Sequence, residues 1–95
     1  MQTENLIAAS IFCSSHHIEF SFISSLQQYG LIEVTATDED LYINSDDLNK
    51  LEQFTRFYYE LQINLEGIDA INHLLEQLQQ KQQEVVNLRN RLQAL

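Results

Sequence analysis

Cys13, His16 and His17 form the densest group of side chains in this chain that could perform chemistry. Thiolate and imidazole are common ligands of zinc and other transition metals, so this Cys-x-x-His-His spacing could supply three ligands. No second cysteine–histidine pair lies nearby, and His73 is sixty residues from Cys13. We therefore interpret the group as a buried cysteine followed by two histidines in a turn, and we predict no metal site and no cofactor.

The same group is a poor candidate for nucleophilic catalysis. A nucleophilic cysteine needs an adjacent base and donors that stabilise an oxyanion. His16 and His17 are close in sequence to Cys13, but neither a glycine-rich turn nor a third orienting group accompanies them. Carboxylates cluster only in runs such as Asp38-Glu39-Asp40 and Asp46-Asp47, which are typical of solvated turns and helix starts. The sequence predicts no catalytic residues, and we expect a protein that is not an enzyme.

Length and composition favour one small globular domain in the cytoplasm. The chain has 95 residues, 44% of them hydrophobic, and no proline. Such a chain can bury one modest core, and its composition is unlike that of disordered proteins. A single cysteine fits a reducing compartment. No apolar run approaches the ~18 residues that a membrane-spanning helix needs. The N-terminus also lacks the basic start of a signal peptide. We expect a cytoplasmic protein that does not associate with membranes.

The charge distribution is the strongest functional signal. The formal net charge is −9, and no lysine or arginine precedes Lys50. Sequence-independent affinity for nucleic acid comes almost wholly from cations that contact phosphates, so nucleic acid is an unfavourable partner. A protein with a basic face is favoured, because complementary fields speed encounter. The first 49 residues contain eight acidic side chains: Glu4, Glu19, Glu33, Asp38, Glu39, Asp40, Asp46 and Asp47.

A first short helix is predicted over residues 9–15. It has room for two turns, with Ile11 and Phe12 as its apolar contacts. The preceding segment, 5–8, suits either an edge strand or the lead into this helix.

A second helix is predicted over residues 19–29. Gly30 follows it at the position where a left-handed residue commonly ends a helix, and Leu31 occupies the hydrophobic position beyond. Phe20 lies off the apolar face. That face is predicted to consist of Phe22, Ile23, Leu26 and Tyr29.

A hairpin and a third helix are predicted next. Residues 32–37 and 41–43 alternate apolar and polar side chains, as half-buried strands do, with an acidic turn between them. Ser45 suits the N-cap of the third helix, and the acidic residues after it suit its first turn. The apolar face of this helix is predicted to consist of Leu48, Leu51, Phe54, Tyr58 and Leu61.

A fourth helix is predicted from Leu65 to Leu95, with Asn64 as its N-cap. Aliphatic residues recur at alternating spacings of three and four, which indicates a two-stranded coiled-coil seam. Lys81 interrupts this seam and would fix its register at a cost in stability. The aliphatic seam residues are Ile71, Leu74, Leu78, Val85, Leu88, Leu92 and Leu95.

Two arrangements of this helix remain open at the level of sequence. The seam could pair with a second copy or a partner helix, or it could fold back onto the chain's own domain. We favour a homodimer through the helix, in either orientation. We predict a winged helix-turn-helix head over 1–63 and a helix for dimerisation or partner packing over 64–95.

Several short motifs lie in an order typical of one family. Tyr29-Gly30-Leu31 stands where a leucine-glycine-leucine corner ends the second helix, and residues 61–68 stand where a leucine-rich phrase opens the dimer helix. In these places the chain resembles the MerR-like winged helix-turn-helix proteins. It also resembles their small chaperone-modulator (CbpM-type) branch, through Phe12-Cys13, Gly30-Leu31-Ile32-Glu33, Glu66-Gly67-Ile68 and Leu88-Arg89-x-Arg91-Leu92.

The resemblance implies a fold and a function. The fold is mainly α, a winged helix-turn-helix with a small β-hairpin wing and a long C-terminal helix. The function is that of a chaperone modulator, which binds the J-domain of a DnaJ-like co-chaperone and inhibits it. J-domains carry a basic helix, which agrees with the acidic charge.

Two other functions are alternatives. The first is a MerR-like DNA-binding transcriptional regulator. DNA-binding relatives keep arginines on the second helix and wing, where this chain has serine, glutamine and acidic residues. The second is an oligomerisation module whose C-terminal helix pairs with another protein's helix.

Two aromatic residues are candidate contacts for a protein partner. Phe20 and Tyr59 are hardest to place on a buried face, and each either covers the edge of the core or serves as an exposed anchor. Acidic residues would then steer a basic partner. The predicted partner-binding residues are Phe20, Asp38, Glu39, Asp40, Asp46, Asp47 and Tyr59.

Overall fold

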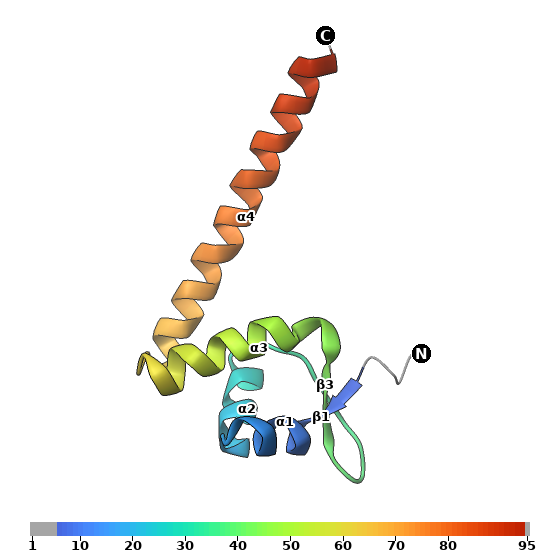
Figure 1. Cartoon of the computed structure of the whole chain (residues 1–95), viewed down its shortest axis with the longest axis vertical. Helices are drawn as coiled ribbons and strands as arrows, with labels where there is room; N and C mark the ends of the chain where they lie inside the picture. The colour runs from blue at the N-terminus through green and yellow to red at the C-terminus, as the bar shows by residue number, and fades with distance from the viewer. Residues whose placement is uncertain (1–5, 95) are drawn as a thin grey trace.

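The chain forms a small head and one long helix that leaves it (Figure 1). The computed structural model describes residues 6–94. Within these residues the predicted fold class is confirmed: mainly α, with a hairpin wing and a long C-terminal helix. The elements are β1 (Leu6–Ala8), α1 (Ala9–His16), α2 (Phe20–Gln28), β2 (Val34–Ala36), β3 (Leu41–Asn44), the 3-10 turn η2 (Ser45–Asp47), α3 (Leu48–Thr55), the π-helical turn η3 (Arg56–Glu60) and α4 (Leu65–Ala94).

The predicted hairpin gains a third strand. The sheet is antiparallel with the order β1-β3-β2, and Ile7 lies opposite Ile43 on the central strand. The edge strand expected at 5–8 is confirmed for Leu6–Ala8, while Asn5 lies outside the described residues. β2 begins at Val34 rather than at Ile32, because Ile32 packs into the core.

One core joins the helices of the head, the β2–β3 hairpin and the start of α4. α1 contributes Ala9 and Phe12, but Ile11 is 62% exposed, so its predicted contact is wrong. The predicted burial of Tyr29 is also wrong, because α2 ends at Gln28 and Tyr29 is its exposed C-cap residue. The buried apolar residues are Ala9, Phe12, Phe22, Ile23, Leu26, Leu31, Ile32, Ile43, Leu51, Phe54 and Ile68.

Gly30 ends α2 as predicted. Its φ of 74° is left-handed, and its N–H donates to the Gln27 carbonyl at 2.9 Å. The Leu31 N–H donates to the Leu26 carbonyl at 2.9 Å, and the Leu31 side chain is buried. These two bonds form a Schellman motif, which satisfies carbonyls at the helix end. The motif turns the chain from α2 toward the wing.

α3 begins with a different cap from the one predicted. The Asn44 side-chain oxygen accepts a hydrogen bond from the Asp46 N–H at 2.9 Å, so Asn44, not Ser45, caps the η2 turn that leads into α3. Leu51 and Phe54 are buried as predicted, and Leu48 packs against the core.

The η3 turn changes the buried face after α3. The Leu61 N–H donates to the Arg56 carbonyl, five residues earlier, at 3.1 Å. A π turn contains more residues than an α turn, so the helical periodicity that predicted burial of Tyr58 and Leu61 no longer applies. Phe57 packs against the core instead, and Tyr58 and Leu61 are exposed. That part of the predicted apolar face is wrong.

α4 begins close against the residues before it. Its N-cap is Asn64, as predicted, because the Asn64 side-chain oxygen accepts from the Gly67 N–H at 2.8 Å. A Cβ atom at Gly67 would lie 2.7 Å from Cγ2 of Ile63, so a side chain there would displace the helix start.

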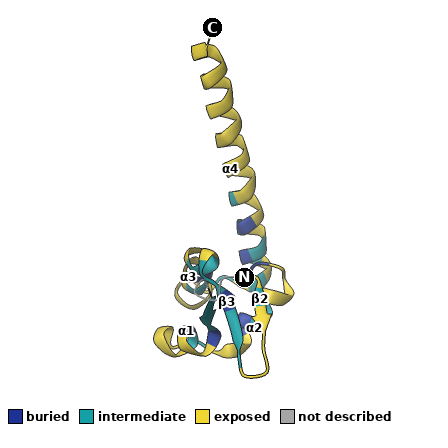
Figure 2. Ribbon diagram, turned by 90° about the vertical axis from the view of Figure 1, so that its right-hand side faces the viewer, coloured by how far each residue is buried: buried dark blue, intermediate teal, exposed yellow. Residues whose placement is uncertain are grey.

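Only the first part of α4 packs on the head. Ile68 and Asn72 are buried, and from Glu76 to Ala94 every residue is exposed (Figure 2). The seam therefore does not fold back onto the head, which excludes that arrangement for this chain alone. Between residues 6 and 94, none of the helices is long and apolar enough to cross a lipid bilayer.

Replacing Gly30 tests the turn that ends α2. Gly30→Ala should destabilise the protein by about 1 kcal/mol, because left-handed backbone is unfavourable for alanine. A Cβ at Gly30 would meet no atom within 4 Å, so steric contact contributes nothing. Urea unfolding measures the change. Gly30→Asn should cost less, because asparagine tolerates this conformation, and an equal cost for both would contradict this explanation.

Candidate protein-interaction surfaces

The α1–α2 pair and the hairpin carry no lysine or arginine. Lys50 lies in α3, Arg56 lies in η3, and the other cations belong to α4. A surface of this kind has nothing that could neutralise phosphates. The side chains of α2 that are exposed or half-buried, apart from Phe20, are Ser21, Ser24, Ser25, Gln27 and Gln28.

The acidic residues predicted to meet a partner divide into two kinds. Asp38 and Glu39 are exposed at the tip of the wing. Asp40, at the end of the same turn, is half-buried and accepts from the Ser10 hydroxyl at 2.7 Å and from the Leu41 N–H at 2.7 Å. The bond to Ser10 joins the wing to α1, so Asp40 contributes to the fold whether or not it meets a partner.

The second acidic pair lies at the start of α3. Asp46 is exposed in η2, near the N-terminus of a helix, where a negative charge is favourable. Asp47 accepts from the Glu33 N–H at 3.3 Å and is half-buried. This pair therefore ties the helix start to the strand side of the head.

The η3 turn, which contains Tyr59, lies at the other side of the head from the wing (Figure 1), and Phe20 follows Glu19, whose N–H reaches the Tyr59 hydroxyl. Both are partly exposed, Phe20 by 43% and Tyr59 by 40%. The Tyr59 hydroxyl accepts from the Glu19 N–H at 3.3 Å, and its ring meets the buried Phe22 edge-on at 5.4 Å. Tyr59 thus covers the edge of the core and presents part of its ring to solvent.

Tyr58 and Tyr29 are surface aromatics that sequence reasoning placed in the core. Tyr58 lies 4.7 Å from Phe22 and 5.1 Å from Tyr59, ring centre to ring centre. The run Phe57-Tyr58-Tyr59 could have indicated an exposed tyrosine, because three consecutive aromatics on a helix cannot all face one core. Partial burial raises the pKa of Tyr29, and the charges of Glu66 and Asp69 raise it further.

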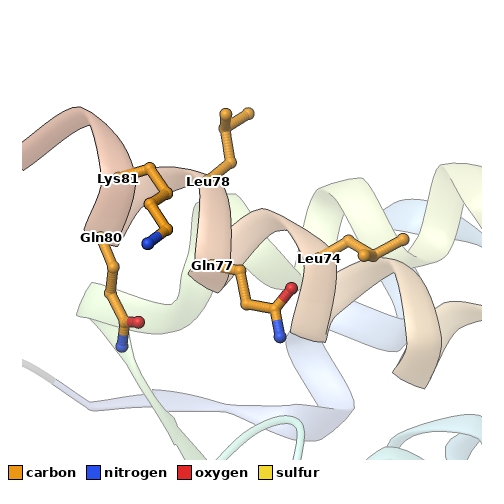
Figure 3. A pocket seen from close by; sticks show the side chains of 5 residues that line it. All are labelled: Leu74, Gln77, Leu78, Gln80 and Lys81. Carbon is orange, nitrogen blue, oxygen red and sulfur yellow. The ribbon is translucent and has the colours of Figure 1, made fainter.

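The C-terminal seam is an uncovered apolar stripe on α4. Its aliphatic residues from Leu74 to Leu92 are between 52% and 71% exposed, and Ile71 is half-buried beside the head. Leu95 lies outside the described residues. Lys81 lies 3.6 Å from Glu84 of the same helix. Leu74, Gln77, Leu78, Gln80 and Lys81 line an open hollow along one stretch of the helix (Figure 3).

The Cys13, His16 and His17 side chains have separate environments. The His16 ring stacks on Phe12 at 4.0 Å, and its Nε2 lies 3.8 Å from a Glu52 carboxylate oxygen. His17 is the exposed, left-handed residue that ends α1. Across residues 6–94, no three histidine, cysteine or acidic side chains converge as a metal site would require. Because of these two contacts, the His16 ring lies between Phe12 of its own helix and Glu52 of α3.

Cys13 is half-buried against the core. Burial raises the pKa of its thiol, and the negative charge of Asp40 raises it further. A higher pKa leaves less thiolate, which is the reactive form.

Comparison with known proteins gives one match. The family model described as MerR HTH family regulatory protein matches residues 7–90, which include all but the first residues of the head and most of α4. No significant similarity to curated proteins or to solved structures was found.

The reactivity of Cys13 tests its surroundings. Alkylation by iodoacetamide near neutral pH should be slower in the folded protein than in urea, because burial and Asp40 disfavour the thiolate. Asp40→Asn should speed the reaction of the folded protein, whereas Asp38→Asn, the same charge change at the wing tip, should have a smaller effect. Equal rates in all three folded proteins would contradict a role for Asp40.

Proposed function

We propose, for a chain that belongs to the MerR HTH regulatory family, that its head binds a protein and not DNA. The protein partner in this proposal is the J-domain of a DnaJ-like co-chaperone. Binding inhibits the co-chaperone by covering the surface with which the J-domain stimulates its chaperone ATPase. The chain acts as a binding protein, without catalysis.

One observation supports this proposal above the others: the absence of lysine and arginine from α1, α2 and the wing. For each phosphate that a protein contacts, the logarithm of its DNA-binding constant falls by roughly 0.9 when the salt concentration rises tenfold. This slope measures how much of the affinity is supplied by lysine and arginine. A head without cations in these elements lacks that contribution. Its acidic surface instead attracts a basic protein and repels phosphate.

The motifs shared with chaperone modulators support the choice of a J-domain. They extend over most of the chain, from Phe12-Cys13 to the arginines near the end of α4. The structure gives two of these motifs a role: Gly30 ends α2, and Gly67 allows α4 to start close to Ile63. These roles concern the fold, so the choice of a J-domain as the partner rests on the resemblance and on charge.

Calorimetric titration with the J-domain of the co-chaperone from the same genome tests the proposal. Binding at micromolar concentrations is expected, and it should weaken as salt is raised because charge contributes to association. An unrelated basic protein of similar size serves as the control for general charge attraction. Absence of J-domain binding, or equal binding of the control protein, would contradict the proposal.

The second candidate function is DNA-binding transcriptional regulation, which the description of the matching family favours. A gel shift with fragments of the surrounding genome distinguishes the two. A regulator would retain a particular fragment and lose it steeply as salt rises. The J-domain proposal expects no specific fragment to be retained.

We also propose that α4 associates with a second copy of this chain. Its exposed aliphatic stripe has the spacing of a coiled-coil seam and lies away from the head. In a parallel pair, Glu84 could reach Arg89 of the partner, but two Lys81 side chains would meet. In an antiparallel pair, the Lys81 side chains lie apart. Pairing with another protein's helix is the alternative.

Sedimentation of the full chain tests the pairing of α4. Leu88→Glu places a charge in the apolar stripe and should convert a dimer to a monomer at micromolar concentrations, since charge is costly in a coiled-coil core. Gln83→Glu adds the same charge on the opposite face and should leave the dimer intact. A wild-type protein that sediments as a monomer, and associates only with an added partner helix, would contradict self-association.

A further inference from the structure

Four aromatic side chains are partly exposed at the start of α2, at its C-cap and on η3. They are Phe20 (43%), Tyr29 (39%), Tyr58 (37%) and Tyr59 (40%). We name these residues the junction strip. Tyr58 and Tyr59 adjoin one another, with ring centroids 5.1 Å apart, and such grouped exposed apolar surface is a common feature of interaction sites, whereas single exposed apolar residues are ordinary. The strip is separate from the wing, since the wing and the η3 turn lie at opposite sides of the head in Figure 1.

The two η3 rings of the strip, Tyr58 and Tyr59, are held in place by contacts with α2. Phe22 is buried, and it contacts Tyr58 at 4.7 Å and Tyr59 at 5.4 Å. The two tyrosine rings meet each other edge-on at 5.1 Å. The Tyr59 hydroxyl is fixed by the Glu19 N–H at 3.3 Å. A partner would therefore meet rings that are already ordered, which lowers the entropy cost of binding.

Carboxylates flank the strip at both ends of α2. Glu19 precedes the helix and is next to Phe20, and Glu60 follows Tyr59 in the chain. At the other end, Glu66 and Asp69 of α4 lie close to Tyr29. Burial raises the pKa of Tyr29, and the charges of these two carboxylates raise it further.

Most of these carboxylates have no cation of their own. Within residues 6–94, Glu19, Glu60 and Glu66 take part in no ion pair, and Asp69 pairs only with His73, at 3.7 Å. Arg56, at the far end of η3, is the one lysine or arginine in α2, η3 and the first two turns of α4. The surface thus combines aromatic rings with unpaired negative charge.

We propose that the junction strip binds a cationic helix of the partner protein. Lysine or arginine side chains would contact the tyrosine rings through cation–π interactions and would pair with the flanking carboxylates. Phe22, on which Tyr58 and Tyr59 pack, precedes Tyr29 by seven residues, or about 10 Å along the axis of α2. Cations about two helical turns apart on the partner would therefore reach both ends of the strip. Nucleic acid and anionic lipid carry the wrong charge for this surface.

This inference rests on the proposed function, because it takes the partner to be a basic protein. It goes further by placing the contact on the junction strip, which is separate from the acidic wing. A second copy of the chain, through Arg89 and Arg91 of its α4, is the competing occupant.

The test uses the isotope-labelled full chain and follows its amide resonances by NMR. The first probe is the J-domain. The second is a synthetic alanine-based helix with two arginines about two turns apart. A peptide with glutamine in place of both arginines is the control. Both cationic probes should shift the amides of Glu19, Tyr29, Tyr59 and Glu66, and should leave Asp38 and Glu39 unchanged.

Matched variants separate the strip from general charge. Tyr59→Leu removes the ring and should weaken J-domain binding about three- to tenfold, whereas Tyr59→Phe keeps the ring and should bind nearly as wild type. The double variant Glu66→Gln, Asp69→Asn removes two charges without altering the core and should weaken binding about threefold or more. The double variant Asp38→Asn, Glu39→Gln removes two charges at the wing tip and should have less than half that effect. Thermal unfolding confirms that each variant is folded.

The outcomes separate this inference from the proposed function. If the J-domain binds but the strip variants do not weaken it, or the wing variant weakens it more, the inference is wrong and the proposed function stands. If only the arginine peptide binds at the strip, the inference stands and the J-domain proposal falls. Strip resonances that shift with protein concentration, without a probe, would assign the strip to a second copy and overturn the inference. Absence of strip shifts with both probes would also overturn it.

Discussion

Packing of the first turns of α4 onto the head determines what this molecule can present to others. Ile68 and Asn72 are buried there, and Asn64 caps the helix immediately before them. The remaining length of α4 receives no support from the head, so its apolar stripe stays uncovered. The same junction exposes Tyr58 and Tyr59 beside α2. One short region therefore creates both surfaces that a partner could cover, and each can be occupied without disturbing the core.

In the proposed function, charge separates this head from a nucleic-acid-binding one of the same shape. The chain has the MerR-like helix-turn-helix and wing, but its five cations lie in α3, η3 and α4. Burial of apolar side chains determines the fold, whereas the exposed side chains determine the class of partner. Serine, glutamine and acidic side chains on α2 and the wing leave the packing of the head intact. They remove the favourable interaction with phosphate, and the acids attract a basic protein.

Sequence patterns predicted the parts of the fold that local rules decide. The glycine after α2 and the cap at Asn64 each depend on neighbouring residues. The failures have tertiary causes. η3 breaks the helical period, which moves Tyr58 and Leu61 to the surface, and Asn44 rather than Ser45 caps η2. The junction strip joins α2 to residues about forty positions later. No local pattern predicts that contact, so Phe20 and Tyr59 could be named but not connected.

The account depends most on the head preferring a basic protein to a polyanion. A competition measurement tests this preference directly. The labelled J-domain is first bound to the full chain at physiological ionic strength, and duplex fragments of the surrounding genome are then added in excess while anisotropy is followed. The account predicts that the complex persists, because α1, α2 and the wing offer the duplex no lysine or arginine. Displacement of the J-domain by one particular fragment, through contact of that fragment with this chain, would contradict it.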